Sequence, residues 1–181
     1  MAKLISKTYG EALFELAVEE AAADGMLEEI TGIRKVLCDN PEYLRFLTNP
    51  RIPAEEKVKT TTEIFTGRVS KEVVGFISLI IRKGRSDALF DILDYFISRM
   101  KEYKGIGVAY VITPQVLKEE KKERIREKLL STTSFKEMEM HYEINPDLLG
   151  GMQIRIGDRV VDSSIQTKLN QLQKELLSLQ V

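Results

Sequence analysis

The sequence predicts an α+β protein in which an N-terminal six-helix bundle at residues 1–104 is followed by a small C-terminal domain with a short β-sheet and helices at residues 105–181. Three observations support this prediction. Apolar residues recur at helical spacing up to about Lys104. Beyond Gly105 they alternate at the period of a β-strand. The length of 181 residues leaves room for one generous domain or for two small ones, since domains most often contain about 100–150 residues.

Turn and cap residues divide the first fifty residues into three helices. The first helix has an apolar stripe of Ile5, Tyr9, Ala12, Leu13, Leu16 and Ala17. We expect Asp24-Gly25 to interrupt it, before a second helix with Leu27, Ile30, Ile33 and Leu37. Asn40 and Pro41 predict an N-cap and a first helical residue for a short third helix, which ends at Pro50.

A fourth helix is expected to begin at Pro53. Glu55 and Glu56 lie in its first turn, where carboxylates suit the positive end of the helix dipole. Gly67 follows its last turn, and Ser70 is the expected N-cap of the fifth helix.

The fifth helix, VVGFISLIIRKG at residues 73–84, is apolar on nearly every side, whereas most surface helices carry one apolar stripe. It is therefore either the most buried helix of the bundle or a helix that also presents a face to a partner. Gly84 is its expected stop. Ser86 then caps a sixth helix with a stripe of Leu89, Ile92, Leu93, Phe96, Met100 and Tyr103.

The C-terminal domain combines strands with a charged helix. A first strand alternates Ile106, Val108, Tyr110 and Ile112 with Gly107, Ala109 and Val111. Residues 118–128, KEEKKERIREK, mix both signs of charge and have sparse apolar anchorage, which predicts a solvated helix lying on a sheet. A second, half-buried strand contains Met138, Met140, Tyr142 and Ile144.

The segment LLGGMQIRIGDRVVDSS at residues 148–164 predicts a turn, a hairpin and the start of a helix. Gly157-Asp158 has the chemistry of a two-residue hairpin turn between short apolar strands. The last helix begins at Ser163 or Ser164 and carries Ile165, Leu169, Leu172, Leu176 and Leu179 at heptad spacing. It either packs on the sheet or meets a partner helix.

Composition excludes several function classes. Lys and Arg number 27 against 28 Asp and Glu, and up to Lys104 the numbers are 16 against 17, so neither half has the basic character of a nucleic-acid binder. No stretch approaches the ~18 continuous apolar residues of a membrane span, and the N-terminus lacks the pattern of a targeting peptide. We expect a protein that is cytosolic or docked on another component.

The residues that carry catalysis and cofactor binding are sparse. Cys38, the only cysteine, ends an apolar helical run and is expected to be a buried structural thiol in a reducing compartment. His141, the only histidine, lies on the polar phase of its strand and is expected to face solvent. Gly157 is followed by Asp158-Arg159 instead of the lysine and hydroxyl of a phosphate loop. The sequence predicts no catalytic residue, no metal site and no cofactor.

Three stretches resemble the delta subunit of the F-type ATP synthase, the bacterial counterpart of the mitochondrial oligomycin-sensitivity-conferring protein. YGEALFELA at residues 9–17 is similar to the family's opening Y-A-x-A-L-F-x-x-A, with Gly10 in place of the usual alanine. FISLIIRKGRSDAL at residues 76–89 matches its fifth helix and G-R turn. GGMQIRIGDRVVDSSIQTKLNQL at residues 150–172 resembles the signature G-G-x-x-I-R-I-G-D-x-x-x-D-x-S-[IV]-x-x-x-L-x-x-L. Ser163 stands where the family usually has glycine.

This resemblance implies a non-catalytic stator subunit, present as one copy per complex. It implies that residues 1–104 bind the N-terminal helix of an alpha subunit in a groove between the first and fifth helices, and that residues 105–181 contact the b subunits of the peripheral stalk. Such a subunit resists the torque of the rotor, so that proton or sodium flow is coupled to ATP synthesis. Its implied location is the cytoplasmic side of the cell inner membrane, as a peripheral part of the complex.

The resemblance also implies the residues that act. The expected groove residues are Tyr9, Ala12, Leu13, Leu16, Phe76, Leu79 and Ile80. For Leu13 and Ile80 a place in the bundle core is an equal alternative. The structural residues of the signatures are Gly84, Arg85, Gly150, Gly151, Gly157, Asp158, Asp162 and Ser164. The alternative function is a free-standing adaptor that binds an amphipathic helix of some other partner.

Overall fold

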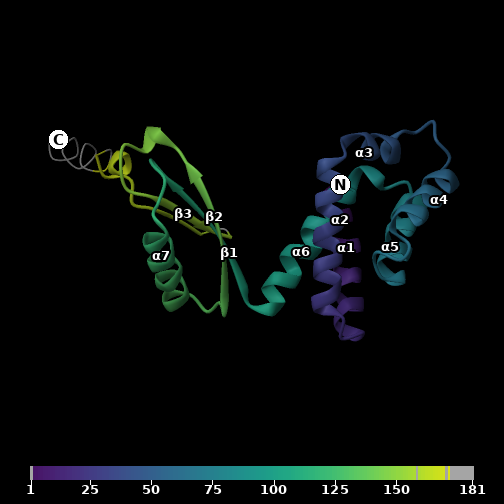
Figure 1. The fold of residues 1–181 in the computed structure, drawn as a ribbon, viewed down its shortest axis with the longest axis horizontal. Helices are drawn as coiled ribbons and strands as arrows, with labels where there is room; N and C mark the ends of the chain where they lie inside the picture. The colour runs from purple at the N-terminus through teal and green to yellow at the C-terminus, as the bar shows by residue number, and fades with distance from the viewer. Residues whose placement is uncertain (1, 158, 170, 172–181) are drawn as a thin grey trace, which may run out of the picture. The chain divides into compact units, whose positions relative to one another are not determined.

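The computed structural model describes residues 2–157, 159–169 and 171, and the chain divides into two compact units at residues 1–100 and 101–181 (Figure 1). The α-helices up to Lys104 are α1 (Ala2–Glu19), α2 (Ala23–Asp39), α3 (Pro41–Thr48), α4 (Ala54–Phe65), α5 (Lys71–Arg82) and α6 (Leu89–Lys104). A short 3-10 helix, η1 (Ser86–Ala88), precedes α6. The division between the units falls inside α6, four residues before that helix ends at Lys104.

One apolar core holds the first unit together. Its largest fully buried side chains include Phe96 and Leu93 of α6, Ile77 of α5 and Leu13 of α1. Because each helix contributes one apolar stripe to this core, the helical spacing in the sequence also identifies which faces are buried.

Several helix boundaries differ from the sequence prediction. Ser86, the expected cap of the sixth helix, lies inside η1, and α6 begins at Leu89. Asp24-Gly25 lies inside α2, whereas α1 ends at Glu19 and the turn that follows contains Ala21, which has a φ of 51°. Alanine seldom takes this left-handed conformation, so no turn residue marks the end of α1 in the sequence. Ser70 precedes α5, but its side chain makes no capping hydrogen bond to the helix; its hydroxyl instead donates a hydrogen bond of 2.6 Å to Glu29.

The second unit contains a four-stranded sheet in the order β2-β1-β3-β4. Its strands are β1 (Ile106–Thr113), β2 (Glu137–Ile144), β3 (Gln153–Ile156) and β4 (Arg159–Asp162). β1 pairs in parallel with β2 and antiparallel with β3, and β3 pairs antiparallel with β4. Helix α7 (Glu119–Thr132) connects the parallel pair, and a 3-10 helix, η2 (Pro146–Leu148), follows β2.

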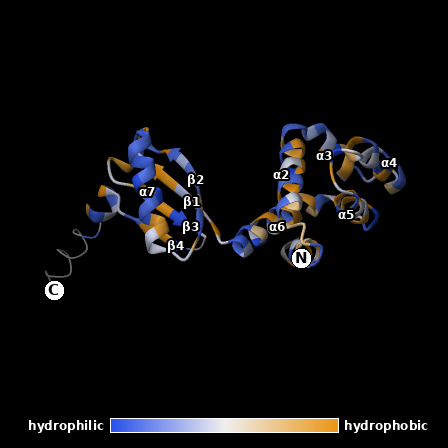
Figure 2. Cartoon of the chain, turned by 60° about the horizontal axis from the view of Figure 1, so that its bottom comes forward, coloured by the Kyte–Doolittle hydropathy of each residue, from blue (hydrophilic) through white to orange (hydrophobic). Residues whose placement is uncertain are grey.

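The two faces of the sheet differ in the size of their side chains. Ala109 and Val111 of β1 are fully buried on the face that α7 covers, while Tyr110 on the other face is 43% exposed. Figure 2 shows α7 itself as predominantly hydrophilic. The bulky residues of β1 therefore lie on the more open face, because the helix needs small side chains beneath it.

The terminal helix lies partly outside the described residues. Residues 165–169 and 171 are helical, while Leu172, Leu176 and Leu179 of the predicted heptad pattern are not described.

Candidate partner-binding surfaces

Helix α5 divides its apolar residues between the core and the surface. Val73, Ile77 and Ile80 are buried, with at most 1% of each residue exposed. Phe76 is half-buried against the core, and Leu79 is 44% exposed. A leucine that is nearly half exposed, beside a partly covered phenylalanine, gives α5 an apolar outer surface as well as an apolar inner one.

Helix α1 has a similar division. Tyr9 and Leu16 are half-buried and Ala12 is exposed, so these predicted groove residues reach the surface. Leu13 is 1% exposed, and Ile80 on α5 is fully buried. Leu13 and Ile80 therefore lie in the bundle core, where they support the outer faces of α1 and α5 from beneath, and their contact with a guest helix stays a prediction.

The glycine in the first motif has a packing reason. A Cβ atom on Gly10 would lie 2.5 Å from Cδ1 of Tyr95, so the ring of α6 occupies the space that an alanine methyl would need. The Tyr95 hydroxyl donates a hydrogen bond of 2.8 Å to Glu11, which also lies beside Arg99. The hydrogen bond from Tyr95 has the largest effect on the pKa of Glu11. Together with the contact to Arg99 it holds that pKa below its usual range, although burial acts to raise it.

The G-R turn after α5 is a helix stop. Gly84 has a φ of 65°, and its N–H donates to the carbonyl of Ile81 at 3.0 Å. The N–H of Arg85 donates to the carbonyl of Ile80, also at 3.0 Å. This pair of bonds is a Schellman motif, which satisfies the last carbonyls of the helix and explains the G-R pair structurally.

The C-terminal signature forms a cap for the terminal helix. The carboxylate of Asp162 accepts hydrogen bonds of 2.8 Å from the Ser164 N–H, the Thr167 hydroxyl and the Gln153 amide. The bond from Ser164 is foremost among those that hold the pKa of Asp162 far below its usual range. Ser164, only 1% exposed, accepts from the Thr167 N–H at 3.3 Å, which is the geometry of an N-cap.

The paired glycines let the chain pass close to this cap. Gly151 has a φ of 82°, and a Cβ atom there would lie 2.4 Å from the Ser163 carbonyl oxygen. A Cβ atom on Gly150 would meet the Ile165 side chain instead. At the hairpin, Ile156 pairs with Arg159 around Gly157, while Asp158 lies outside the described residues.

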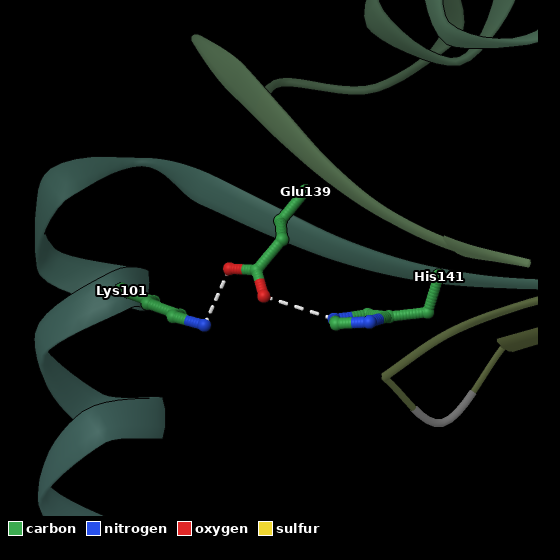
Figure 3. Close-up of polar contacts among 3 residues, drawn as sticks. All are labelled: Lys101, Glu139 and His141. Atoms are coloured by element: carbon green, nitrogen blue, oxygen red, sulfur yellow. Dashed lines mark hydrogen bonds and ion pairs between the residues drawn. The ribbon is translucent and has the colours of Figure 1, made fainter. Parts of the chain in front are cut away.

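A polar cluster of the second unit lies on the face of the sheet opposite α7. Glu139 accepts from Lys101, in the last turn of α6, and contacts Nε2 of His141 at 2.9 Å (Figure 3). Burial raises the pKa of Glu139, but Lys101 and His141 together outweigh burial and lower that pKa. His141 stacks on Tyr110, with 4.9 Å between ring centroids. The predicted solvent-facing position of His141 is confirmed, since 46% of its side chain is exposed. Its contact with Glu139 and its stacking on Tyr110 hold the ring in place on the surface of the sheet.

Cys38 is not the buried thiol that the sequence predicts. Cys38 is exposed near the C-terminal end of α2, because Leu37 beside it takes the buried position. Within the described residues, no three His, Cys, Asp or Glu side chains are grouped so that they could hold a metal ion. None of the described helices has the length and apolarity that crossing a membrane requires.

Comparison with known proteins covers nearly the whole chain. The sequence model of the ATP synthase delta (OSCP) subunit matches residues 5–176. A protein of Lachnoclostridium phytofermentans named ATP synthase subunit delta is 50% identical over 181 residues, the full length of both chains. A protein of the same name from Alkaliphilus oremlandii is 35% identical over 176 residues, 97% of each chain.

A solved structure shares the fold. A chain in the mitochondrial ATP synthase hexamer of Toxoplasma gondii superposes with a TM-score of 0.81, covering 95% of this chain and 97% of that chain at 17% identity. At that identity the likeness concerns the fold, namely helices combined with a small four-stranded sheet.

Proposed function

Because the chain belongs to the ATP synthase delta (OSCP) subunit family and is a non-catalytic peripheral-stalk subunit of the F-type ATP synthase, we propose a division of labour between its two parts. Residues 1–104 act as a six-helix bundle that binds the N-terminal helix of an alpha subunit. Residues 105–181 contact the b subunits. One copy per complex then links the catalytic head to the membrane sector from the cytoplasmic side of the membrane.

The observation that carries the first contact is the outer surface of α5. Leu79 is 44% exposed although four other apolar residues of the same helix are buried. Exposed apolar surface of this kind is used when an amphipathic helix lays its apolar face into a groove. We place the guest between α1 and α5, where Tyr9, Ala12 and Leu16 supply the second wall.

The physical requirement on this contact is slow dissociation under load. The subunit resists rotor torque so that ion flow is coupled to ATP synthesis. Within one interface most differences in affinity come from the dissociation rate. Apolar side chains such as Leu79 and Phe76 suit this task, because full burial of such a side chain contributes about 1.5–3 kcal/mol and binding can bury the part of each that is still exposed.

The alternative of a free-standing adaptor is not favoured. The family match extends over residues 5–176, and a relative is aligned over its full length. An adaptor for an unrelated helix would share the α5 surface, but it would not need the C-terminal signature that forms the cap at Asp162 and Ser164.

The substitution Leu79→Asp tests the groove. We expect it to abolish binding of a synthetic alpha-subunit N-terminal peptide, weakening affinity at least about 100-fold, because apolar contact is lost and a carboxylate must be desolvated. Calorimetric titration of the full chain measures this. The fold is expected to persist, since the side chain is already 44% exposed.

Val36→Asp is the matched control, because Val36 is also apolar and is 41% exposed, but lies on α2. It should bind the peptide as the unsubstituted chain does. Unchanged affinity in the Leu79 variant, or an equal loss in the Val36 variant, would remove the groove assignment.

A further inference from the structure

The charges of α7 are sorted by face, although their signs alternate along the sequence. At about 100° per residue, Glu119, Glu120, Glu123 and Glu127 fall within about 100° of the helix circumference. Lys121, Arg124 and Lys128 fall together on another side, within about 60°. A helix whose charged side chains contacted only solvent would have no reason to place the two signs of charge on different sides.

The other cations of α7 are engaged in local contacts. Lys122 pairs with Glu119 at 2.7 Å, and Arg126 pairs with Glu123 at 3.4 Å. The Lys122 ammonium also lies 5.2 Å from the centroid of the Tyr142 ring, whose hydroxyl bonds the Lys122 carbonyl. This side of α7 therefore packs over β2 with its charges satisfied.

The remaining side of α7 borders two hollows, one toward each end of the helix. The first hollow, of ≈ 570 Å³, lies beside Lys121, Arg124 and Ile125. The second, of ≈ 770 Å³, lies beside Lys128 and Leu129. From Lys121 to Thr132 this side is about 16 Å long, which matches about three turns of a second helix.

Strands β3 and β4 form the opposite wall of the second hollow, and the segment just before β3 forms that of the first. Ile154 and Ile156, alternate residues of β3, line the second hollow, and Met152 just before β3 lines the first. Val161 of β4 also lines the second hollow and is 62% exposed. We call these two neighbouring hollows together, with α7 on one side and residues 149–161 on the other, the α7–β3 trough.

The rim of the α7–β3 trough is basic. Lys121, Arg124, Lys128 and Arg159 line the two hollows, and among the described lining residues none carries a carboxylate. Throughout the part of the chain that the structure describes, no hydrogen bond or ion pair is recorded for the charged groups of these four side chains. An apolar floor with four uncompensated cations around it is complementary to an apolar stripe flanked by carboxylates.

We propose that the α7–β3 trough binds an acidic amphipathic helix of another subunit. The inference rests on the proposed function, in which the second unit carries the contact with the stalk, and it assigns that contact a surface and a chemistry. The chain's own residues 165–181 fit less well, because they carry Lys168 and Lys174 but only one acidic residue, Glu175. A second copy of the chain would bring a near-neutral surface, since the net charge is -1.

The probe is a labelled 21-residue peptide with leucine at i, i+3, i+4 and i+7 spacing and glutamate on its flanks, compared with the same peptide carrying lysine. Fluorescence anisotropy with the full chain is expected to detect the glutamate peptide only, with affinity falling as salt rises. Arg124→Gln with Lys128→Gln should weaken binding at least tenfold. Lys122→Gln with Arg126→Gln removes the same charge from the same helix and should change affinity less than twofold.

A second pair of variants tests the apolar wall. Val160 and Val161 are each 62% exposed and are neighbours on β4, so their side chains lie on opposite faces of the sheet. Val161→Asp should lower affinity for the glutamate peptide at least tenfold, while Val160→Asp should leave it unchanged. Circular dichroism confirms folding of each variant.

Several results would overturn the proposal. If both variants of either pair lost the same affinity for the glutamate peptide, its attraction to the chain would be non-specific. Binding that appears only after residues 170–181 are removed would make the terminal segment the occupant. Self-association of the chain that Val161→Asp abolishes would make a second copy of the chain the occupant of the trough.

Reconstitution separates this proposal from the proposed function. If the unsubstituted chain restores coupling to synthase membranes depleted of this subunit, and the Arg124/Lys128 and Val161 variants restore it equally well, the trough is excluded while the stalk function stands. If the unsubstituted chain fails to join the synthase yet binds the glutamate peptide through the trough, the proposed function is wrong and the trough remains.

Discussion

Gly151 and Gly157 have the same left-handed backbone but different surroundings. Gly151 has a φ of 82°, and a Cβ atom there would lie 2.4 Å from the Ser163 oxygen and 2.8 Å from the Ser164 Cα. Gly157 has a φ of 55° with open space around it. Gly157 is therefore needed only for its left-handed backbone conformation. Gly151 is needed for that conformation and also because the chain packs closely against the helix cap.

This difference predicts unequal costs for the same substitution. Gly157→Ala should lower the free energy of unfolding of the second unit by about 1–2 kcal/mol, the cost of a left-handed alanine. Gly151→Ala should lower it by about 3 kcal/mol or more, because backbone atoms must also move. Urea unfolding followed by circular dichroism measures both, and equal costs would contradict the close approach at Ser163.

At the scale of elements, an apolar pattern predicts a strand or helix more reliably than it predicts which side is covered. In β1 the buried residues include the two smallest, Gly107 and Ala109, while Tyr110 on the other face is 43% exposed. A Cβ atom on Gly107 would lie 2.6 Å from the ring of Phe135. From hydrophobicity alone, the face of β1 that carries Tyr110 would be predicted to be the buried one.

The burial of β1 can be tested with one residue on each face. Ala109→Leu should lower the free energy of unfolding by about 1–3 kcal/mol, because it adds volume where Ala109 is fully buried beneath α7. Tyr110→Leu, at a site that is 43% exposed, should have a smaller effect. Chemical denaturation of both variants gives the comparison, and the reverse order of costs would mean that the covered face is misassigned.

At the scale of the whole molecule, the chain consists of two compact units with separate apolar interiors. Phe96 and Leu93 belong to the core of the first unit, and Val111 and Met138 are buried in the second. Each unit therefore has an apolar core of its own, as is expected of parts that unfold separately.

Separate cores predict separate unfolding. Phe96→Ala should destabilise the first unit by about 3–5 kcal/mol, because a fully buried ring is removed. Protection of the second unit from hydrogen exchange should be unchanged. Mass spectrometry of peptides from residues 1–100 and 105–157, under rising urea, measures the two independently. Simultaneous loss of protection in both would show that they unfold as one.

Much of this organisation is predictable because it depends on short-range chemistry. The glycine stop at Gly84, the strand over residues 106–113 and the start of the terminal helix near Ser164 are visible in residue type and spacing. The end of α1 is not, because it depends on an alanine at positive φ. The exposure of Cys38 is not predictable in this way either, since one step around a helix separates it from buried Leu37.

The sequence by itself determined the order and kind of the elements and, through three motifs, the family. Periodicity, caps and turn residues act within a few positions of the chain, so they can be identified without coordinates. Only the tertiary structure decided that Leu13 and Ile80 lie in the core while Leu79 stays exposed, and that three cations of α7 face a trough while two others are paired. Those outcomes depend on which elements pack together, because a side chain's exposure and charge partners come from residues distant in the sequence.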